Sequence, residues 1–201
     1  MQEENTMSIR IRLIASAIES SAVAHKLSGL QAGVGLCRRS HRYQRDSVLG
    51  IQVKIRNYSV HDRQSCLQVL DGNTPEFFVP KDRDDFSRFL DNLPGPYFVI
   101  EDRGLIVACG GWAMDAEEVA VLTWGMVRRD LHRQGIGRDL LHYRLRAIWA
   151  DGHAKVVQLR TVPPVQEFFA RQGFDVVDVV PNGYGAGLDR VTMALQLRVA
   201  V

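Results

Sequence analysis

The residues best suited to chemistry in this sequence are two glycines, Gly135 and Gly137, flanked by Arg133 and Arg138. A glycine carries no side chain that would hold an anion away from the main chain, so N–H groups at a helix start can point at phosphate oxygens. The helix dipole adds roughly 0.3–1 kcal/mol per favourable charge contact, and the two arginines can add charge-assisted hydrogen bonds. We therefore expect residues 133–138, here called the cradle, to bind a diphosphate.

A strand and a helix must position the cradle. Before it, residues 119–127 are apolar on both alternating faces, as a central strand covered on both sides of a sheet requires. After it, Leu141, Leu145 and Ile148 stand at helical spacing. The sequence thus predicts a buried strand, a loop that contains the cradle, and a helix. The alternative is an ordinary helix entry after a turn, without a ligand.

The cradle sequence resembles the acyl-coenzyme A signature of the GCN5-related N-acetyltransferase (GNAT) superfamily. That signature reads Arg or Gln, two residues, Gly, one residue, then Gly or Ala, and here His132, Gly135 and Gly137 take its places. His132 departs from the usual Arg or Gln, but members of the superfamily hold the diphosphate mainly through backbone N–H groups. The resemblance implies that coenzyme A is the ligand of the cradle.

A second marker of the same superfamily lies downstream. Residues 155–161 predict a strand, and residues 163–172 predict a helix in which proline stands only in the first turn and which a glycine ends. The run 168–174 resembles the superfamily's pattern of an aromatic residue, Tyr, three residues, then Gly-Phe. Two markers in the right order and spacing extend the resemblance over roughly residues 53–197.

The resemblance implies an α/β fold with a mixed sheet, a GNAT-like acyl-CoA N-acyltransferase domain over residues 50–201. Its central, mostly antiparallel sheet would have about six to seven strands and about four flanking helices. In the superfamily the pantetheine arm lies in a gap where two neighbouring strands splay apart, and here these strands would be 119–127 and 155–161. The expected contacts of acetyl-CoA, which would be a co-substrate, are Met126, Val127, His132, Arg133, Gln134, Gly135, Ile136, Gly137, Arg138 and Phe169.

Direct attack of an amine on acetyl-CoA in a ternary complex needs two further groups. The thioester carbonyl must be polarised by a donor that does not reorganise, and the backbone N–H of Val127 would serve as that oxyanion contact. A lysine-like amine is mostly protonated at pH 7, and neutralising it costs roughly 4 kcal/mol. The candidate bases are Glu117, Glu118 and Asp115, and the alternative is that they are solvated residues of a hairpin turn.

Phe169 is a departure from the superfamily that bears on mechanism. Many members place a Tyr here that can protonate the departing thiolate, whereas Phe has no proton to give. Coenzyme A has the pKa of ordinary thiols, about 8.5, so water or the product ammonium could protonate it. We therefore expect activity to survive, with Phe169 packed against either the pantetheine arm or the core.

The acceptor is the least determined part of the function. Trp124 and Tyr184 are the expected substrate contacts, with Asp189 and Arg190 on the same hairpin as Tyr184. The alternatives are a core position for Trp124 and a flexible turn for the hairpin. If the indole is exposed instead, it could hold an ammonium by cation–π attraction. A small amine, an antibiotic, a polyamine, an amino acid or a protein amino group all suit this superfamily.

The remaining predicted elements are strands and short helices. Residues 51–56 alternate apolar and polar as a half-buried strand does, and Asp62 is expected to cap the helix that follows. Residues 82–90 predict a second short helix. Strands at 97–101 and 105–112 should form a hairpin with glycine in its turn.

Composition narrows the class of protein. The 201 residues are 46% hydrophobic and 24% charged, which is typical of a globular chain, and a net charge of +2 argues against a dedicated polyanion binder. The three cysteines are widely spaced and form no Cys-x-x-Cys pair, so no metal is expected. Free cysteines of this kind are compatible with a reducing cytoplasm, where we expect the protein to be. No run of about 18 apolar residues predicts a membrane span. We expect a monomer or homodimer.

Residues 1–49 are expected to form a poorly ordered or loosely helical extension, unless translation starts further in. Their basic run 38–45 could touch nucleic-acid or membrane phosphates, although a solvated tail is the simpler interpretation and neither partner is expected. Two functions remain open for the domain. The first is an N-acetyltransferase that acts on a primary amine. The second is a catalytically weak acyl-CoA-binding module, motivated by Phe169, His132 and the lack of an evident base.

Overall fold

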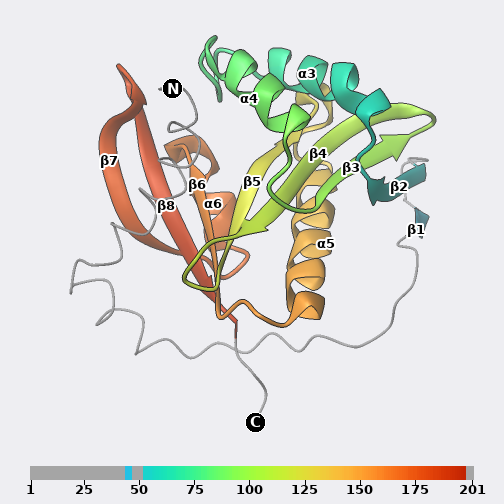
Figure 1. Ribbon diagram of the computed structural model, residues 1–201. Helices are drawn as coiled ribbons and strands as arrows, with labels where there is room; N and C mark the ends of the chain where they lie inside the picture. Colours follow the sequence, from blue (N-terminus) through green and yellow to red (C-terminus); the bar gives the residue numbers. More distant parts are fainter. Residues whose placement is uncertain (1–43, 47–51, 198–201) are drawn as a thin grey trace, which may run out of the picture.

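One eight-stranded sheet runs through the described part of the protein (Figure 1). The computed structural model describes residues 44–46 and 52–197. The strands are β1 Gln44–Asp46, β2 Gln52–Asn57, β3 Tyr97–Asp102, β4 Leu105–Met114, β5 Val119–Val127, β6 Val156–Thr161, β7 Asp175–Gly185 and β8 Leu188–Gln196. Their order in the sheet is β1-β2-β3-β4-β5-β6-β8-β7, and all neighbouring pairs are antiparallel except β5 and β6.

The central strand β5 separates from β6 after a short parallel pairing. Only Val119, Ala120 and Val121 pair with β6, whereas β5 continues to Val127 and β6 pairs along its whole length with β8. The sheet therefore contains the splayed strand pair that the sequence predicted. Three-residue β1 adds to the six or seven strands that were expected.

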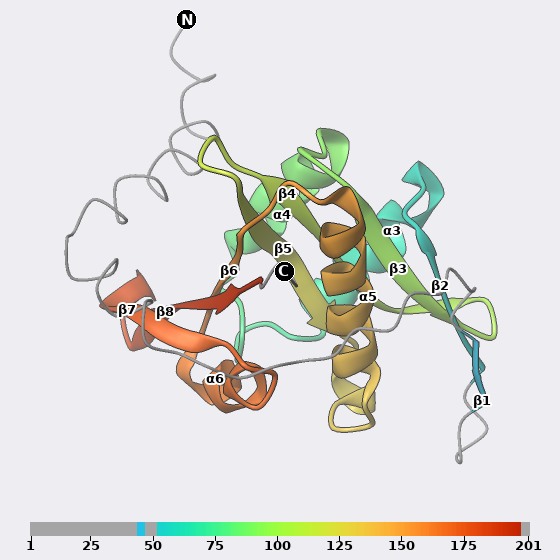
Figure 2. The same ribbon diagram turned by 90° about the horizontal axis from the view of Figure 1, so that it is seen from below.

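Helices cover both faces of this sheet (Figure 1, Figure 2). The four α-helices of the described residues are α3 Arg63–Asp71, α4 Asp82–Asp91, α5 Ile136–Asp151 and α6 Pro163–Ala170. Helices α3 and α4 lie on one face and α5 lies on the opposite face, while α6 packs beside β7 and β8. Two short 3-10 helices, η2 Val60–Asp62 and η3 Arg129–Leu131, lead into α3 and into the cradle loop.

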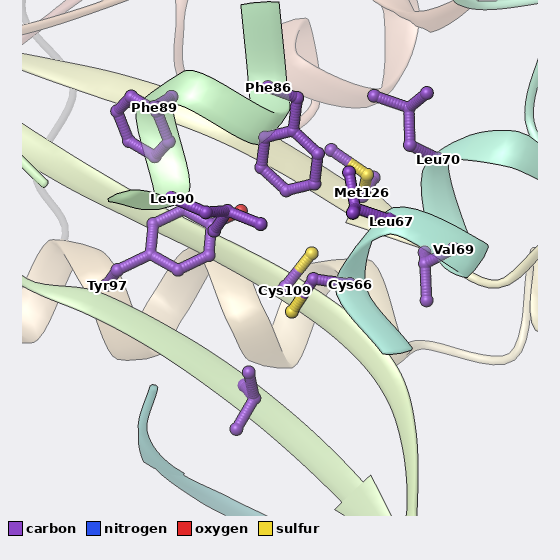
Figure 3. Packing of buried hydrophobic residues seen from close by; sticks show 11 residues of the cluster. Cys66, Leu67, Val69, Leu70, Phe86, Phe89, Leu90, Tyr97, Cys109 and Met126 are labelled. Carbon is purple, nitrogen blue, oxygen red and sulfur yellow. The ribbon is translucent and has the colours of Figure 1, made fainter. Parts of the chain in front are cut away.

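Apolar side chains fill both faces of the sheet. Figure 3 shows the cluster beneath α3 and α4, which is made of Cys66, Leu67, Val69, Leu70, Phe86, Phe89, Leu90, Tyr97, Val99, Cys109 and Met126. Cys66 and Cys109 are free, fully buried thiols. The interaction with Cys109, together with burial, raises the pKa of the Cys66 thiol. Cys66 is therefore an inert packing residue at neutral pH.

Most elements occur where the sequence placed them, but Asp62 has a different partner. Strand β5 coincides with the predicted residues 119–127. Asp62 precedes α3 but makes no capping hydrogen bond to that helix. Its carboxylate accepts from the Arg56 guanidinium at 2.6 and 2.8 Å and from Ser59 N at 2.8 Å. The predicted cap was wrong because a guanidinium forms stronger hydrogen bonds with a carboxylate than a neutral amide does.

The predicted extension, residues 1–49, lies outside the described residues except for β1. This strand pairs antiparallel with β2, and Gln44 stands opposite Lys54. Most of the basic run 38–45 also lies outside the described residues, so its role stays a prediction.

Candidate active site

The cradle lies in the loop between β5 and α5. Gly135 precedes the helix with φ of +89°, and Arg133 has φ of +63°, so the chain passes twice through the left-handed region. No side chain caps α5, and its first intrahelical hydrogen bond runs from Asp139 N to Gly135 O at 3.0 Å. The amides of residues 136–138 therefore have no acceptor in the described part of the chain. They are in the state that anion binding requires.

The last residue of β5 presents its peptide groups to the gap. Arg128 N donates to Val107 O on β4 at 2.8 Å. Because peptide groups alternate in direction along an antiparallel strand, the N–H and C=O of Val127 point away from β4, to the side from which β6 has moved away. The N–H of Val127 thus faces the gap.

His132 fastens the cradle loop to this end of β5. Its Nε2 lies 2.9 Å from Val127 O, and the Nδ2 of Asn73 donates to the same oxygen at 2.9 Å. The His132 ring also meets Phe77 edge-on, with 5.6 Å between ring centroids. The sequence predicted a coenzyme A contact at His132, but the structure directs its ring nitrogen at the protein main chain. The imidazole is therefore placed to hold the loop in position.

Two phenylalanines of α6 border the cradle. A Cβ placed on Gly137 would lie 3.6 Å from Val127 Cγ2 and 3.8 Å from Phe168 Cζ, so Phe168 is the ring beside the cradle. Phe169 packs edge-on against Phe168 and Phe174, with centroid distances of 4.9 and 5.8 Å. Phe169 also lines the cleft that extends from the cradle along β5. Phe169 thus belongs to the core on one side and reaches the cleft on the other.

A cleft of about 2050 Å³ extends from the cradle along β5 to α4. This exceeds the roughly 300–1,000 Å³ of a pocket for one small ligand. Its far wall is aromatic: Trp124 packs against Phe78 at 6.3 Å and Phe86 at 5.0 Å between centroids. The Tyr97 hydroxyl donates to Trp124 O at 3.0 Å. Trp124 has φ of +39°, a strained value for a bulky residue, and these contacts hold it there.

The hairpin between β7 and β8 forms another part of the cleft wall. Asn182 N donates to Asp189 Oδ1 at 2.8 Å, and Gly187 N donates to Asn182 Oδ1 at 2.6 Å. These side chains therefore tie the turn together. Tyr184 and Arg190 line the cleft from this hairpin, on the side where the sequence placed an acceptor contact.

Of the three predicted bases, only Asp115 reaches the cleft. Glu117 and Glu118 are exposed before β5, and Val127 ends that nine-residue strand, roughly 30 Å away at about 3.3 Å per residue. Glu118 pairs with Lys155 at 2.6 Å, and this hydrogen bond lowers the pKa of its carboxyl. The structure therefore does not bring Glu117 or Glu118 to the cradle, contrary to the prediction. Asp115 Oδ1 accepts two backbone N–H groups, both at 2.9 Å, and its Oδ2 is buried without a partner.

Comparison with known proteins places this geometry in a family. Residues 94–176, which include the cradle, the whole of β5 and α6, match the family model for an acetyltransferase (GNAT) domain. Residues 94–176 therefore carry a GNAT acetyltransferase domain. This match supports an acetyltransferase activity for that domain. No curated protein matches its sequence.

Solved structures share the fold of this GNAT domain. The ribosomal-protein-S18-alanine N-acetyltransferase from Escherichia coli has 18% identity and a TM-score of 0.64, over 75% of this chain and 97% of that one. An aminoglycoside 6'-N-acetyltransferase complexed with coenzyme A has 15% identity and a TM-score of 0.62, over 73% and 98%. A Salmonella typhimurium structure solved with its cofactor acetyl-CoA has 17% identity and a TM-score of 0.62, over 75% and 96%. At these identities the likeness establishes the fold.

The sequence interpretation did not name Asn73, Phe168 or Arg144, which line the cleft. Asn73 comes from the loop between α3 and α4, where no local pattern marks it. Phe168 stands beside Phe169 in the second marker and could have been named with it. Arg144 had an indirect signal, because Gly110 and Gly125 interrupt apolar strands, and a glycine inside a strand often marks a bulge or a close approach.

Among the described residues, no helix has the length and apolar character needed to cross a bilayer. In the same residues, no group of three or more His, Cys, Asp or Glu side chains is arranged to hold a metal ion.

Proposed function

We propose that this protein is an N-acetyltransferase that moves the acetyl group of acetyl-CoA to a primary amine by direct attack in a ternary complex. The observation that carries the proposal is the cradle, where the amides of residues 136–138 lie open beside the gap between β5 and β6. The family match supports the acetyl-transfer chemistry. Two structures of the same fold, solved with coenzyme A and acetyl-CoA, support the identity of the co-substrate.

The cradle fits the diphosphate of coenzyme A. Arg133, Gln134 and Arg138 are exposed around the open amides, so their side chains can reach phosphate oxygens, although Gln134 Nε2 would first have to leave Asp130 O, to which it donates at 3.3 Å. The Ile136 side chain is buried, which leaves only its amide for the ligand. The ring of Phe168 lies where it would cover the pantetheine arm as that arm enters the gap.

Val127 supplies the oxyanion contact in this proposal. Its N–H faces the gap without any movement of β5, so it would stabilise negative charge on the thioester oxygen at no reorganisation cost. The amine nitrogen attacks the carbonyl carbon, and the carbon–sulfur bond then breaks. The products are an acetamide and coenzyme A, and the proton lost by the amine balances the proton gained by the thiolate.

Water in the cleft takes the proton that the amine loses in this proposal. None of the three carboxylates predicted as bases stands beside Val127. The Thr123 hydroxyl is buried without a partner and belongs to a residue that lines the cleft on β5, so it is placed to hold an ordered water. Asp115 lines the cleft at the end of β5 away from Val127, where β4 leads into β5. Trp124 and Tyr184 border the acceptor.

Release of free thiol from acetyl-CoA tests the proposal. The full chain is incubated with acetyl-CoA and a panel of amines that includes an aminoglycoside, a polyamine, amino acids, and peptides with a free N-terminus or a lysine. We expect thiol release above the rate of hydrolysis with at least one amine. Glu118→Gln should leave that rate unchanged, because Glu118 does not line the cleft.

A coenzyme A-binding module is the second candidate function. Two observations favour it: Phe169 has no proton to give to a thiolate, and no carboxylate of the predicted set reaches Val127. Calorimetric binding of coenzyme A, with no thiol release across the whole panel, would overturn the transferase proposal in favour of the module.

A further inference from the structure

Arg144 is a buried guanidinium at the floor of the cleft. The side chain comes from α5, is only 4% exposed, and still belongs to the cleft lining. An arginine is almost never buried in this way without a partner that balances its charge. The surroundings of Arg144 therefore need an explanation.

Two glycines make room for this guanidinium between β4 and β5. A Cβ on Gly125 would lie 2.8 Å from Arg144 Nη1 and 3.0 Å from Nη2, and a Cβ on Gly110 would lie 3.1 Å from Nη1. Any side chain at either position would displace the arginine. The register of β4 and β5 also shifts here, between Cys109 and Gly111. The strands are thus shaped around the guanidinium.

The charge of Arg144 has no counter-ion among the described residues. Its Nη1 lies 3.5 Å from Gly111 O, at the limit of a hydrogen bond, and its Nε is buried without a partner. The ionisable groups that act on it are Tyr97 and Cys109, from β3 and β4. Burial raises the pKa of Tyr97, so the phenol is neutral and cannot balance the charge.

The guanidinium nevertheless remains charged at neutral pH. Burial lowers the pKa of Arg144 to about 10, which still leaves the protonated form in large excess at pH 7. Arg56 offers a contrast, because it is paired with both Asp62 and Glu101. A buried and unpaired positive charge is unfavourable unless an anion joins it.

We propose that Arg144 binds the negative charge that collects on the sulfur of coenzyme A when acetyl transfer breaks the carbon–sulfur bond. The inference rests on the proposed function and names the group that stabilises the leaving thiolate. Gly125 lies two residues before Val127 on β5, so the guanidinium beneath it is next to the place where the thioester would lie. The charge of Arg144 would thus stabilise the leaving thiolate, which Phe169 cannot protonate.

Titration of the thiol of bound coenzyme A tests this proposal without any acceptor. Thiolate absorbance near 240 nm is followed from pH 6 to 10 with coenzyme A bound, and the same protein with dethio-coenzyme A gives the background of its own cysteines and tyrosines. In the native protein we expect the bound thiol to titrate about one pH unit below the usual 8.5 or so. In Arg144→Met it should return to 8.5 or higher. At pH 8 the preference for coenzyme A over dethio-coenzyme A should fall several-fold.

Three variants separate the charge of Arg144 from its packing. Arg144→Lys keeps a positive charge and should retain part of the shift. Gly125→Ala keeps the arginine but displaces it, and should lose part of the shift. Arg146→Met, an exposed arginine on the same helix, should change nothing. If Arg144→Met fails to fold, the lysine and alanine variants still decide the matter by the same titration.

The proposal is overturned if the bound thiol titrates at the same pH in the native protein and in Arg144→Met. If that variant also raises the KM for the acceptor, Arg144 is assigned to an acceptor carboxylate instead. Failure of the transferase proposal is recognised separately, because thiol release would then be absent with every amine while the Arg144-dependent titration persists.

Discussion

The two ends of the cleft are built from different parts of the chain. At the cradle end, the groups proposed to bind the ligand belong to the main chain: the amides of residues 136–138 and the N–H of Val127. At the acceptor end, the wall consists of side chains, with Trp124 and Phe78 on one side and Tyr184 on the other. A main-chain site accepts the same ligand whatever the neighbouring side chains are. A side-chain site changes its ligand with each substitution, so the fold fixes the donor but leaves the acceptor open.

The largest effect should come from a side chain placed in the main-chain site. We expect Gly135→Glu to weaken coenzyme A binding at least about 100-fold by calorimetry. The new residue would carry a carboxylate where the diphosphate belongs, at φ of +89°, where a side chain is strained by about 1–3 kcal/mol. Gly152→Glu is the matched control, because Gly152 ends the same helix with φ of +81° and has nothing within 4 Å of its Cβ position. Equal loss of affinity in both variants would mean that strain in α5, and not the cradle, is responsible.

A second test concerns how the acceptor side is held in place. Asp62, only 7% exposed, joins β2 to the start of α3 through Arg56 and Ser59. Asp62→Asn should lower the free energy of unfolding by about 1.5–3 kcal/mol, the range for a hydrogen bond to a charged group, with coenzyme A affinity unchanged. Asp91→Asn, which breaks the exposed pair with Arg63, should have a smaller effect. Loss of coenzyme A affinity in Asp62→Asn would show that the two ends are not independent.

The pH dependence of this contribution has a definite sign. The hydrogen bonds from Arg56 are the main cause that lowers the pKa of Asp62 in the folded protein. The stabilisation is therefore complete above the ordinary aspartate pKa of about 3.9, and is lost as the pH falls through the lower folded value. In urea titrations, the difference between the native protein and Asp62→Asn should stay constant from pH 7 to about 5 and shrink below pH 4. A difference that grows in acid would contradict this assignment.

The same contrast explains what the sequence could predict. The cradle and β5 were predictable because glycine spacing and apolar alternation are local patterns, and β5 spans the residues expected. Glu117 and Glu118 lie far from the cradle, and the chain order alone could have shown this. They stand in the hairpin before the nine-residue strand β5, whereas the cradle stands in the loop after it, so the two lie at opposite ends of that strand. Arg144 depends on glycines from two strands that meet only in the fold. No single stretch of sequence contains that information.

Neighbouring phenylalanines should report on the two ends separately. Phe77 meets the ring of His132 at the cradle end, and Phe78 stacks on Trp124 at the acceptor end. We expect Phe77→Ala to weaken coenzyme A binding by about three- to tenfold, since an aromatic pair contributes about 0.5–1.5 kcal/mol. Phe78→Ala should raise the acceptor KM by a similar factor and leave coenzyme A affinity unchanged. The two variants control for each other, and the division between the ends fails if both alter the same constant.

The smallest effect is expected where the two ends meet, at Phe169. Phe169→Tyr restores a phenol where many superfamily members have one, and its ring already reaches the cleft. We expect kcat to change less than about threefold, because a thiolate with a pKa near 8.5 departs readily without an acid. In the Arg144→Met background the same substitution should raise kcat more, since the phenol would then provide stabilisation that the guanidinium no longer gives. A tenfold increase from Phe169→Tyr in the native background would instead show that leaving-group protonation limits the reaction, and that Arg144 does not replace it.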